Sequence, residues 1–484
     1  MNITLTDPSI LRTQCYVNGE FVGTGQAPVA NPATGELLAH VPAFGSDEAI
    51  AAVEAAAMAF KSWSLRLAKD RANILRRWFD LIVVHRDDLA LILTSEQGKP
   101  LAEARGEIDY AASYIEFYAE EAKRIAGETL PSHRSDGRIL VLRQASGVVA
   151  AITPWNFPAA MITRKVGPAM AAGCTVVLKP AGETPLTALA LAGLAHRAGV
   201  PAGVLNVITG APAPIGEVLT SHPAVRVVSF TGSTAVGKQL MRQSAGTVKK
   251  VALELGGNAP FIVFDDADLD AAVEGAIISK FRNGGQTCVC TNRIYVQRAI
   301  ADDFTSRLAA AVAKLAVGDG RSADVQMGPL INDKAIDKVE AHIANAVELG
   351  ARVVVGGRRH ALGRTFFEPT LLSGVTDDMT VAKEETFGPL APVFVFDDEN
   401  DVVGRANDTE FGLAAYLYSR DIGRIFRVGE ALEYGMVGVN SGLISSELAP
   451  FGGIKESGNS REGSHHGIDE FVEKKYLFLA GLDR

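Results

Sequence analysis

The sequence predicts an α/β protein that contains a doubly wound parallel sheet and a second α/β domain. Two observations favour this fold class. With 484 residues the chain is longer than one hydrophobic core usually serves, so two or three domains are expected. From residue 147 onward, short apolar runs alternate with segments of helical period, and a second series of the same kind follows residue 254. This alternation is typical of βαβ units that share one sheet.

Three helical patterns and one strand come before the first series. Ser46, followed by two acidic residues, is a suitable N-cap for the alanine-rich run that ends at Trp63. Residues 71–96 and 101–125 carry apolar side chains at helical spacing. The alternating residues 138–143 follow a turn-rich stretch and are expected to form a strand.

Four apolar runs of the first series are strand candidates, and helical patterns lie between them. The strands are expected at 148–152, 175–179, 204–208 and 226–230, and the helices at 159–172, 185–198 and 215–221. The second series places strands at 261–264, 293–296, 352–355 and 393–396. Open parallel sheets bind ligands beyond the carboxyl ends of their strands, so functional residues are expected there.

Composition and charge exclude several classes of protein. Hydrophobic residues make up 47% and charged residues 21% of the chain, as in ordinary globular proteins. A net charge of −9 argues against a nucleic-acid-binding surface. The most apolar region, 148–178, is interrupted by prolines and cations, which argues against a membrane span. No metal site is expected, because the four cysteines form no CxxC pair. Few cysteines and no secretory pattern over 1–14 favour the cytoplasm.

Three residues outside the regular elements could carry covalent chemistry on a carbonyl group. Cys288 follows the glycine-rich stretch 283–287, which allows the backbone to turn and expose the thiol. Glu254 precedes a glycine pair and is a candidate general base. Asn156 lies between two prolines and could donate to an oxyanion. Two of them also have a plain alternative: Cys288 could be an inert buried cysteine, and Asn156 a turn asparagine that bonds its own backbone.

Two further turns are suited to a nucleotide. Gly232 and Ser233 lie between a strand and a helix, where backbone N–H groups can hold a pyrophosphate. Lys179 ends another strand and could reach a ribose or a phosphate, although a solvated surface lysine is the alternative. Residues 232–238 also approach a P-loop, but Gln239 occupies the position of the magnesium-binding hydroxyl, which argues against a nucleotide triphosphatase.

Taken together, these motifs resemble the aldehyde dehydrogenase superfamily over essentially the whole chain, and within it the bacterial succinate-semialdehyde dehydrogenase branch. The resemblance rests on blocks whose order and spacing match: 154–158, 179–180, 230–234, 253–257, 285–288, 385–389 and 450–453. Residues 161–165, 281–283 and the pair Cys288 and Cys290 favour the branch.

The resemblance implies a role for each motif residue. Cys288 is expected to be the nucleophile, Glu254 the base that activates water, and Asn156, with the Cys288 N–H, the oxyanion hole. The substrate is expected to be a small semialdehyde acid whose carboxylate meets Arg164, Arg282 and Ser445. The residues expected at the cofactor are Thr153, Trp155, Lys179, Gly182, Gly232, Ser233, Leu255, Glu385 and Phe387.

The expected cofactor is NADP, with NAD possible. NAD-specific enzymes of this family usually carry a glutamate three residues after the lysine, and this position holds Gly182 here. A carboxylate there would repel a 2′-phosphate, whereas Lys179 can pair with one. The alternatives within the class are a glutarate-semialdehyde or a broad aliphatic aldehyde dehydrogenase. A catalytically silent relative is disfavoured because Cys288, Glu254 and Asn156 are all present.

The resemblance also implies three structural parts and an oligomer. A Rossmann-type dinucleotide-binding domain is expected over 1–121 and 145–254, and an α/β catalytic domain over 255–455. A small bridging β element is expected over 122–144 and 456–484, and it favours a homotetramer or a homodimer. Cys290 could form a disulfide with Cys288, but a packed cysteine is the preferred interpretation. Asn459 and Ser460 depart from the usual Leu-Gly, with no consequence expected for the chemistry.

Overall fold

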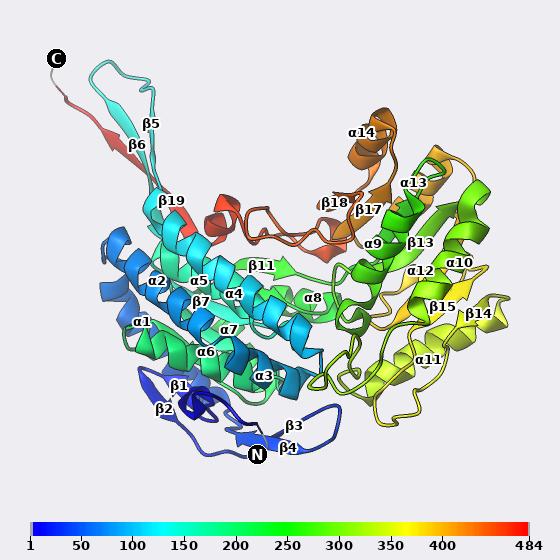
Figure 1. The fold of residues 1–484 in the computed structure, drawn as a ribbon. Helices are drawn as coiled ribbons and strands as arrows, with labels where there is room; N and C mark the ends of the chain where they lie inside the picture. The colour runs from blue at the N-terminus through cyan, green and yellow to red at the C-terminus, as the bar shows by residue number, and fades with distance from the viewer. Residues whose placement is uncertain (1–2, 483–484) are drawn as a thin grey trace.

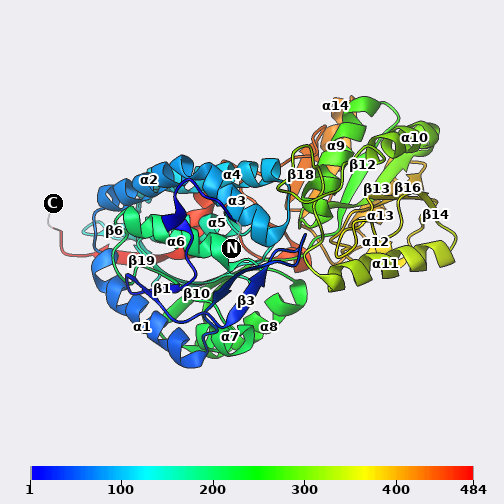
Figure 2. The same cartoon turned by 60° about the horizontal axis from the view of Figure 1, so that its bottom comes forward.

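The computed structural model describes residues 3–482, which form two lobes and a projecting arm (Figures 1 and 2). The first lobe contains a seven-stranded sheet in the order β11-β10-β7-β8-β9-β1-β2. The second contains another seven-stranded sheet, in the order β14-β15-β16-β13-β12-β17-β18. The arm is the three-stranded sheet β19-β6-β5. A small hairpin of β3 (Ala27–Ala30) and β4 (Leu37–Val41) lies beside the first lobe.

The first sheet confirms the predicted parallel βαβ arrangement at its centre. Its strands are β1 (Cys15–Val17), β2 (Glu20–Val22), β7 (Val148–Ile152), β8 (Thr175–Lys179), β9 (Leu205–Val207), β10 (Val225–Thr231) and β11 (Lys250–Glu254). Its helices are α1 (Ser46–Trp63), α2 (Ala68–Val84), α3 (Arg86–Gln97), α4 (Leu101–Glu121), α5 (Ala160–Ala172), α6 (Pro185–Arg197), α7 (Pro212–Ser221) and α8 (Thr234–Ser244).

Helices cover both faces of this sheet, which explains why its strands are apolar without alternation. In β7, Val149 and Ala151 belong to the hydrophobic core beneath α2 to α6. Val148 and Ala150 point to the opposite face and pack with α1 and α7. Figure 2 shows the two helical layers on either side of the strands.

The sequence-based expectations were wrong at the borders of the first sheet. The edge pair β1 and β2 is antiparallel and was not predicted, because each strand has only three residues. The helix expected over 71–96 is two helices that meet at His85, although the apolar period continues through the junction.

The second lobe has the predicted parallel core and one antiparallel edge. Its strands are β12 (Ala259–Val263), β13 (Thr291–Gln297), β14 (Arg352–Val355), β15 (Thr370–Ser373), β16 (Leu390–Phe396), β17 (Ala414–Tyr418) and β18 (Met436–Val439). Strand β14 runs antiparallel to β15. The helices are α9 (Leu269–Phe281), α10 (Ala301–Val312), α11 (Asp333–Glu348), α12 (Thr380–Lys383), α13 (Glu399–Asn407) and α14 (Ile422–Ala431).

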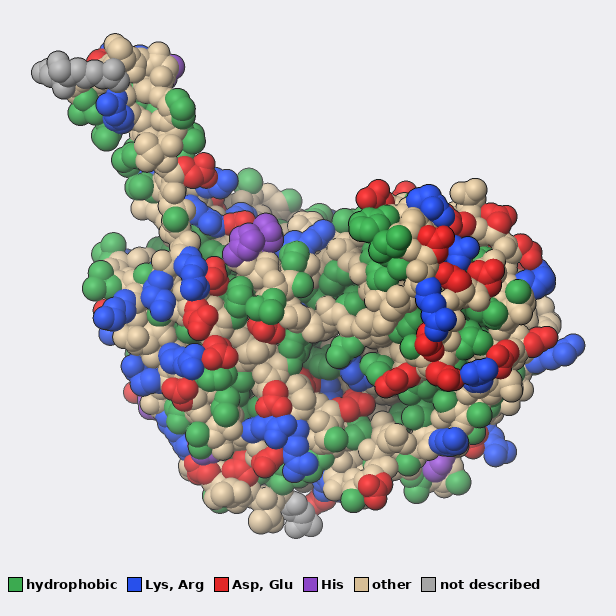
Figure 3. Space-filling view, turned by 45° about the horizontal axis from the view of Figure 1, so that its top comes forward, with side chains coloured by type: hydrophobic (Ala, Val, Ile, Leu, Met, Phe, Trp, Pro, Cys, Tyr) green, Lys and Arg blue, Asp and Glu red, His purple; other side chains and the backbone are tan. Residues whose placement is uncertain are grey.

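The arm combines β5 (Glu128–Leu130) and β6 (Arg138–Ala145) with the C-terminal strand β19 (Val472–Leu479). Strand β19 pairs with β6 antiparallel along its full length, from Val472 opposite Ala145 to Leu479 opposite Arg138. Figure 3 shows the arm standing away from the body with hydrophobic side chains exposed along it. These include Leu130, Leu142, Tyr476 and Leu479. The predicted domain boundaries at 121, 144, 254 and 455 remain a prediction.

A buried carboxylate connects two helices of the first lobe. Glu96, near the end of α3, accepts hydrogen bonds from the backbone N–H groups of Leu186 at 2.7 Å and Thr187 at 2.8 Å. Both belong to the first turn of α6, which begins at Pro185. Glu96 therefore takes the place of an N-cap for a helix that receives no cap from its own side chains.

We expect Glu96→Ala to lower the free energy of unfolding by about 1–3 kcal/mol, because two buried N–H groups lose their acceptors. The melting temperature, followed by circular dichroism, measures this effect. Glu54→Ala, on an exposed position of α1, is the matched control and should leave the melting temperature unchanged. Equal melting temperatures for the Glu96 variant and the unaltered protein would contradict the capping role.

Candidate active site

The loop that carries Cys288 turns sharply because three successive residues adopt positive φ. After α9 ends at Phe281, the φ angles are 52° at Asn283, 62° at Gly284 and 74° at Gly285. A Cβ atom on Gly285 would lie 2.1 Å from the backbone oxygen of Gly388. Glycine is therefore required there on two counts, conformation and space. The turn leaves Cys288 partly exposed, while Cys290 is buried and its Sγ donates to the Lys280 carbonyl at 3.3 Å.

Cys288 opens into a cavity of about 230 Å³ between the two lobes. The wall contains eight of the residues that the sequence placed at the reaction site: Trp155, Asn156, Gly232, Ser233, Leu255, Cys288, Glu385 and Phe387. Met161 and Thr231 complete the wall on the side of the first lobe. The Thr231 hydroxyl is buried and has no hydrogen-bond partner within residues 3–482, so the cavity retains an unused polar group.

Asn156 is held from both its side chain and its backbone. Its Nδ2 donates to the Gln286 carbonyl at 3.0 Å, which ties it to the cysteine loop. Its backbone carbonyl accepts from Lys99 Nζ at 2.7 Å and from Asn283 Nδ2 at 3.0 Å. Lys99 is itself buried and paired with Glu107 at 2.6 Å. The sequence analysis did not find Lys99, because a lysine between Gly98 and Pro100 gives no sign that it will be buried.

Glu254 is the last residue of β11 and only 3% of it is exposed. Its Oε1 accepts a hydrogen bond from the Ser460 hydroxyl at 2.8 Å. Its Oε2 is buried and has no hydrogen-bond partner in the described part of the chain. Burial raises the pKa of Glu254 well above its ordinary value, and the neighbouring Glu462 raises it further.

Burial and the nearby arginines have opposite effects on the pKa of the Cys288 thiol. Burial raises the pKa of Cys288 to about 12, whereas Arg164 and Arg282 act to lower it. Glu385 and Glu254 add to the rise. A thiol in this setting stays protonated at neutral pH until a base or a bound ligand changes its environment.

Arg164 and Arg282 lie in different surroundings. Arg164 on α5 is fully buried, contacts Glu462 at 2.7 Å and lies 3.8 Å over the Phe451 ring. Its Nη2 has no hydrogen-bond partner among residues 3–482. Arg282 is partly exposed, and lines a narrow space beside Cys288 together with Thr287, Val289, Tyr416 and Ile444. Ser445 follows Ile444 directly and is partly exposed. The structure thus places a cation and a hydroxyl-bearing loop near the thiol.

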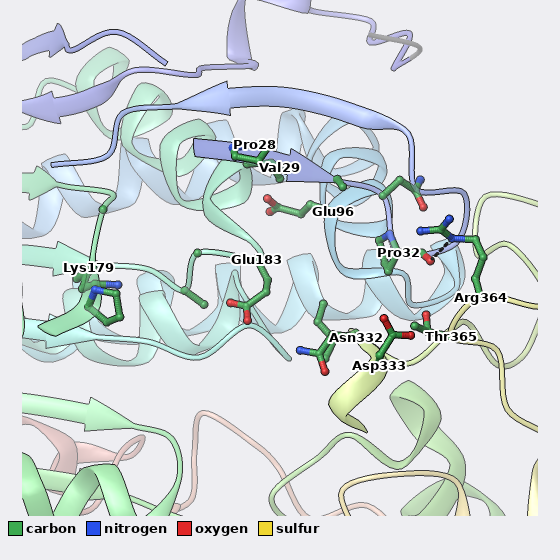
Figure 4. A pocket seen from close by; sticks show the side chains of 17 residues that line it. Pro28, Val29, Pro32, Glu96, Lys179, Glu183, Asn332, Asp333, Arg364 and Thr365 are labelled. Atoms are coloured by element: carbon green, nitrogen blue, oxygen red, sulfur yellow. Dashed lines mark hydrogen bonds between the residues drawn. The ribbon is translucent and has the colours of Figure 1, made fainter. Parts of the chain in front are cut away.

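A second cavity of about 680 Å³ lies at the ends of β8 and β9 (Figure 4). Lys179 and Glu183 come from one side, while Asn332, Asp333 and Arg364 come from the other. Gly182 also lines it, and no atom lies within 4 Å of a Cβ built there. Burial lowers the pKa of Lys179, whose Nζ donates to Pro180 O at 3.3 Å and to no other group within residues 3–482.

The two cavities suit the two halves of a dinucleotide. Both lie beyond the carboxyl ends of parallel strands, where such sheets bind ligands. Helix α8 begins at the smaller cavity, which Gly232 and Ser233 line. Among the described residues, the one side chain that caps its first turn is Ser233, whose Oγ accepts from the Val236 N–H at 3.5 Å. Thr153, at the end of β7, carries another buried hydroxyl without a partner among the described residues.

The carboxylate of Glu385 faces the smaller cavity. Its Oε1 accepts from the Gly257 N–H at 3.1 Å, and burial raises its pKa to about 7. Phe387, with φ of 54°, meets Trp155 edge to face at 5.6 Å between ring centroids. Both rings line the smaller cavity, together with Ser233 and Thr231.

The sequence profile of the aldehyde dehydrogenase family matches residues 21–477. The chain belongs to the aldehyde dehydrogenase family. The NADP(+) succinate-semialdehyde dehydrogenase of Escherichia coli K12 is 62% identical over 478 residues, covering 98% of this chain and 99% of that protein. The glutarate-semialdehyde dehydrogenase of Pseudomonas aeruginosa PAO1 is 62% identical over 481 residues, covering 99% of this chain and all of that protein.

Solved aldehyde dehydrogenase structures confirm the predicted fold class. The succinate-semialdehyde dehydrogenase of Burkholderia pseudomallei has a TM-score of 0.98 and 63% identity, covering 99% of this chain and 100% of that one. The Rossmann-type α/β architecture expected from the resemblance is therefore correct. No helix in the described part of this aldehyde dehydrogenase is both long and apolar enough to cross a membrane.

We expect Gly285→Ala to disrupt the cysteine loop of this aldehyde dehydrogenase, because the added methyl group would collide with the Gly388 carbonyl. Aldehyde oxidation should fall at least about tenfold, and the melting temperature should decrease. Gly404→Ala is the matched control: Gly404 lies exposed within α13, with open space around its Cβ position. That substitution should preserve activity and stability. Normal activity in the Gly285 variant would refute the steric requirement.

Proposed function

We propose that this aldehyde dehydrogenase oxidises succinate semialdehyde to succinate with NADP as the hydride acceptor. The observation that carries the proposal is Arg282, which lines a narrow space beside the Cys288 loop. Arg164 is a second cation near the thiol, and it is buried against Glu462. A cation near the thiol selects an aldehyde that carries its own carboxylate. The names of the E. coli and B. pseudomallei relatives support the same substrate.

Glutarate semialdehyde is the second candidate. The P. aeruginosa glutarate-semialdehyde dehydrogenase is as similar to this chain as the E. coli enzyme, at 62% identity. The two substrates differ by one methylene, which is worth roughly 1–3 kcal/mol in a well-fitted pocket. Both require the same carboxylate-binding cation, so the arginines favour the class rather than the chain length.

In the proposed reaction, Cys288 gives its proton to solvent water and its sulfur adds to the aldehyde carbon. Asn156 Nδ2 and the Cys288 N–H donate to the oxyanion that forms. The Asn156 amide is held in place for this through Gln286 and Lys99. A cofactor held by the residues around the two cavities would supply the acceptor for the hydride that leaves the former aldehyde carbon, and this carbon remains bound to Cys288 as a thioester. Removing one such oxyanion donor typically costs about a hundredfold in rate or more.

Glu254 then acts on the thioester. It accepts a proton from a water molecule, whose oxygen attacks the thioester carbonyl, and the Cys288 thiol is released together with the carboxylic acid. A base with a raised pKa is well matched to this task near neutral pH. The unpartnered Oε2 is the oxygen available to take that proton.

The residues around the two cavities are proposed to hold the cofactor. Lys179 and Gly182 would face the adenine ribose and its 2′-phosphate, Gly232 and Ser233 the pyrophosphate, and Glu385 and Phe387 the nicotinamide riboside. Thr153, Trp155 and Leu255 would line the cleft. Preference for NADP is supported by the absence of a carboxylate at position 182 and by the NADP(+) in the name of the E. coli relative.

We also propose a cytoplasmic homotetramer or homodimer. The arm ends on both sides in unpaired strands, β5 and β19, with exposed apolar side chains such as Tyr476 and Leu479. Such edges are usually covered by association with another copy.

The substrate assignment is tested by kcat/KM for succinate semialdehyde, glutarate semialdehyde and neutral aldehydes of two to six carbons. We expect the unaltered protein to prefer succinate semialdehyde. Arg282→Ala should raise KM for the semialdehyde acids about tenfold or more, because a carboxylate loses its cation, and should spare neutral aldehydes. Arg298→Ala, at an exposed ion pair far along the second lobe, is the control. Equal losses on acids and neutral aldehydes would reject carboxylate binding by Arg282.

Cofactor choice is tested at position 182. We expect Gly182→Glu to reduce kcat/KM for NADP about tenfold or more and to leave NAD oxidation unchanged or improved, because a carboxylate repels the 2′-phosphate. The side chain has open space there. Glu183→Gln, at the neighbouring exposed position, controls for a general change of charge in this loop. An unaltered preference for NADP in the Gly182 variant would contradict the proposed location of the phosphate.

A further inference from the structure

The segment 457–462 runs beside the end of β11 and fixes the backbone around Glu254. The Leu255 N–H donates to Ser457 O at 2.9 Å, and the Asn459 N–H donates to Leu253 O at 3.1 Å. The Asn459 side chain completes the contact by accepting from the Leu253 N–H at 3.0 Å. These hydrogen bonds fix the backbone just before residue 460 beside Glu254.

The Ser460 hydroxyl has two acceptors within reach. Its Oγ lies 2.8 Å from Glu254 Oε1 and 3.1 Å from Leu253 O. A hydroxyl carries one hydrogen, so it fully serves one acceptor at a time, and its oxygen can also accept. With Glu254 ionised, the hydroxyl donates to Oε1. With Glu254 protonated, the carboxyl group can donate to Oγ while the hydroxyl turns to Leu253 O.

No other hydrogen-bond donor meets the Glu254 carboxylate among residues 3–482. Gly452 also lies against the carboxylate, since a Cβ on it would be 2.9 Å from Oε1, and it offers no side chain. The charged and titratable groups around Glu254 are Glu462 on the same C-terminal segment, Arg164 and Lys165 on α5, and Cys288 on the catalytic loop. Both cations are already paired with Glu462.

We propose that Ser460 is a positioning residue for Glu254: its hydroxyl holds Oε1 in both protonation states and leaves Oε2 for the water that cleaves the thioester. This role deepens the proposed function and rests on it. Ser460 occupies the position at which related chains usually carry glycine, so the serine hydroxyl adds a donor to Glu254 that glycine lacks. Glycine has no donor for Oε1, so the carboxylate of such a chain would be ionised and oriented by other means.

The hydroxyl stabilises the ionised carboxylate more than the neutral acid. Without it, the pKa of Glu254 rises further, and less of the base is ionised at a given pH. The acidic limb of the pH–rate profile for thioester hydrolysis should then move to higher pH by roughly one unit. At a pH below this limb, hydrolysis should be about tenfold slower. Thioester formation does not use Glu254 and should keep its rate.

The test compares Ser460→Ala, Ser460→Thr and Asn459→Ala with the unaltered holoenzyme, using the best aldehyde from the substrate panel. The first-turnover burst of reduced cofactor reports thioester formation, and the steady-state rate between pH 5.5 and 9 reports hydrolysis. Intact-mass spectrometry after rapid quenching measures the fraction of acylated Cys288. We expect Ser460→Ala to retain the burst, accumulate the acyl-enzyme and shift the acidic limb upward. Ser460→Thr should restore the limb. Asn459→Ala removes one contact of the backbone but keeps the hydroxyl, so it should shift the limb less than Ser460→Ala does.

An unshifted acidic limb in Ser460→Ala, or faster hydrolysis, would overturn the proposal. So would an equal shift in Asn459→Ala, or a Ser460→Thr variant that behaves like the alanine variant, because either result would assign the effect to packing. Failure of the proposed substrate is seen separately, as the absence of turnover of succinate semialdehyde by the unaltered enzyme. In that case the Ser460 comparison proceeds on whichever aldehyde is oxidised.

Discussion

The site depends on the buried ion pairs that the Glu462 carboxylate makes. This carboxylate contacts Arg164 and Lys165, two consecutive buried cations of α5, from a segment nearly 300 residues later in the chain. Burial by itself would raise the pKa of Glu462, but Lys165 and Arg164 hold it below its ordinary value. Removing one member of such a buried cluster leaves uncompensated charge, which typically costs about 3–5 kcal/mol. The C-terminal segment is therefore anchored to the first lobe by charge as well as by backbone pairing.

This anchor explains how groups from distant parts of the chain are kept in register. The backbone of Glu462 pairs with that of Phe451, whose ring lies against the Arg164 guanidinium. Arg164 in turn lowers the pKa of both Cys288 and Glu254 against the effect of burial. The site is thus arranged around opposed influences: a dry cavity that favours neutral groups, and a few fixed cations and donors that favour the ionised forms needed for chemistry.

Much of this arrangement could be predicted from the sequence where the signal is local. The continuous apolar runs at Val148–Ile152 and Thr175–Lys179 identify central strands, because helices on both faces remove any need for alternation. The glycines before Cys288 correctly indicated a sharp turn. Long-range contacts could not be predicted. Nothing near Lys99 shows that its ammonium group will hold the Asn156 carbonyl, and the serine at 460 was expected to be without consequence although it contacts Glu254.

The distance in sequence between α5 and its counterion has a consequence for how the protein is made. Lys165 and Glu462 are 297 residues apart. At a synthesis rate of about 5–20 residues per second, Lys165 leaves the ribosome roughly 15–60 s before its partner. Burying two unpaired cations is costly, so α5 reaches its final packing only after the C-terminal segment emerges. Until Glu462 is synthesised, two buried cations of α5 in the first lobe lack their counterion.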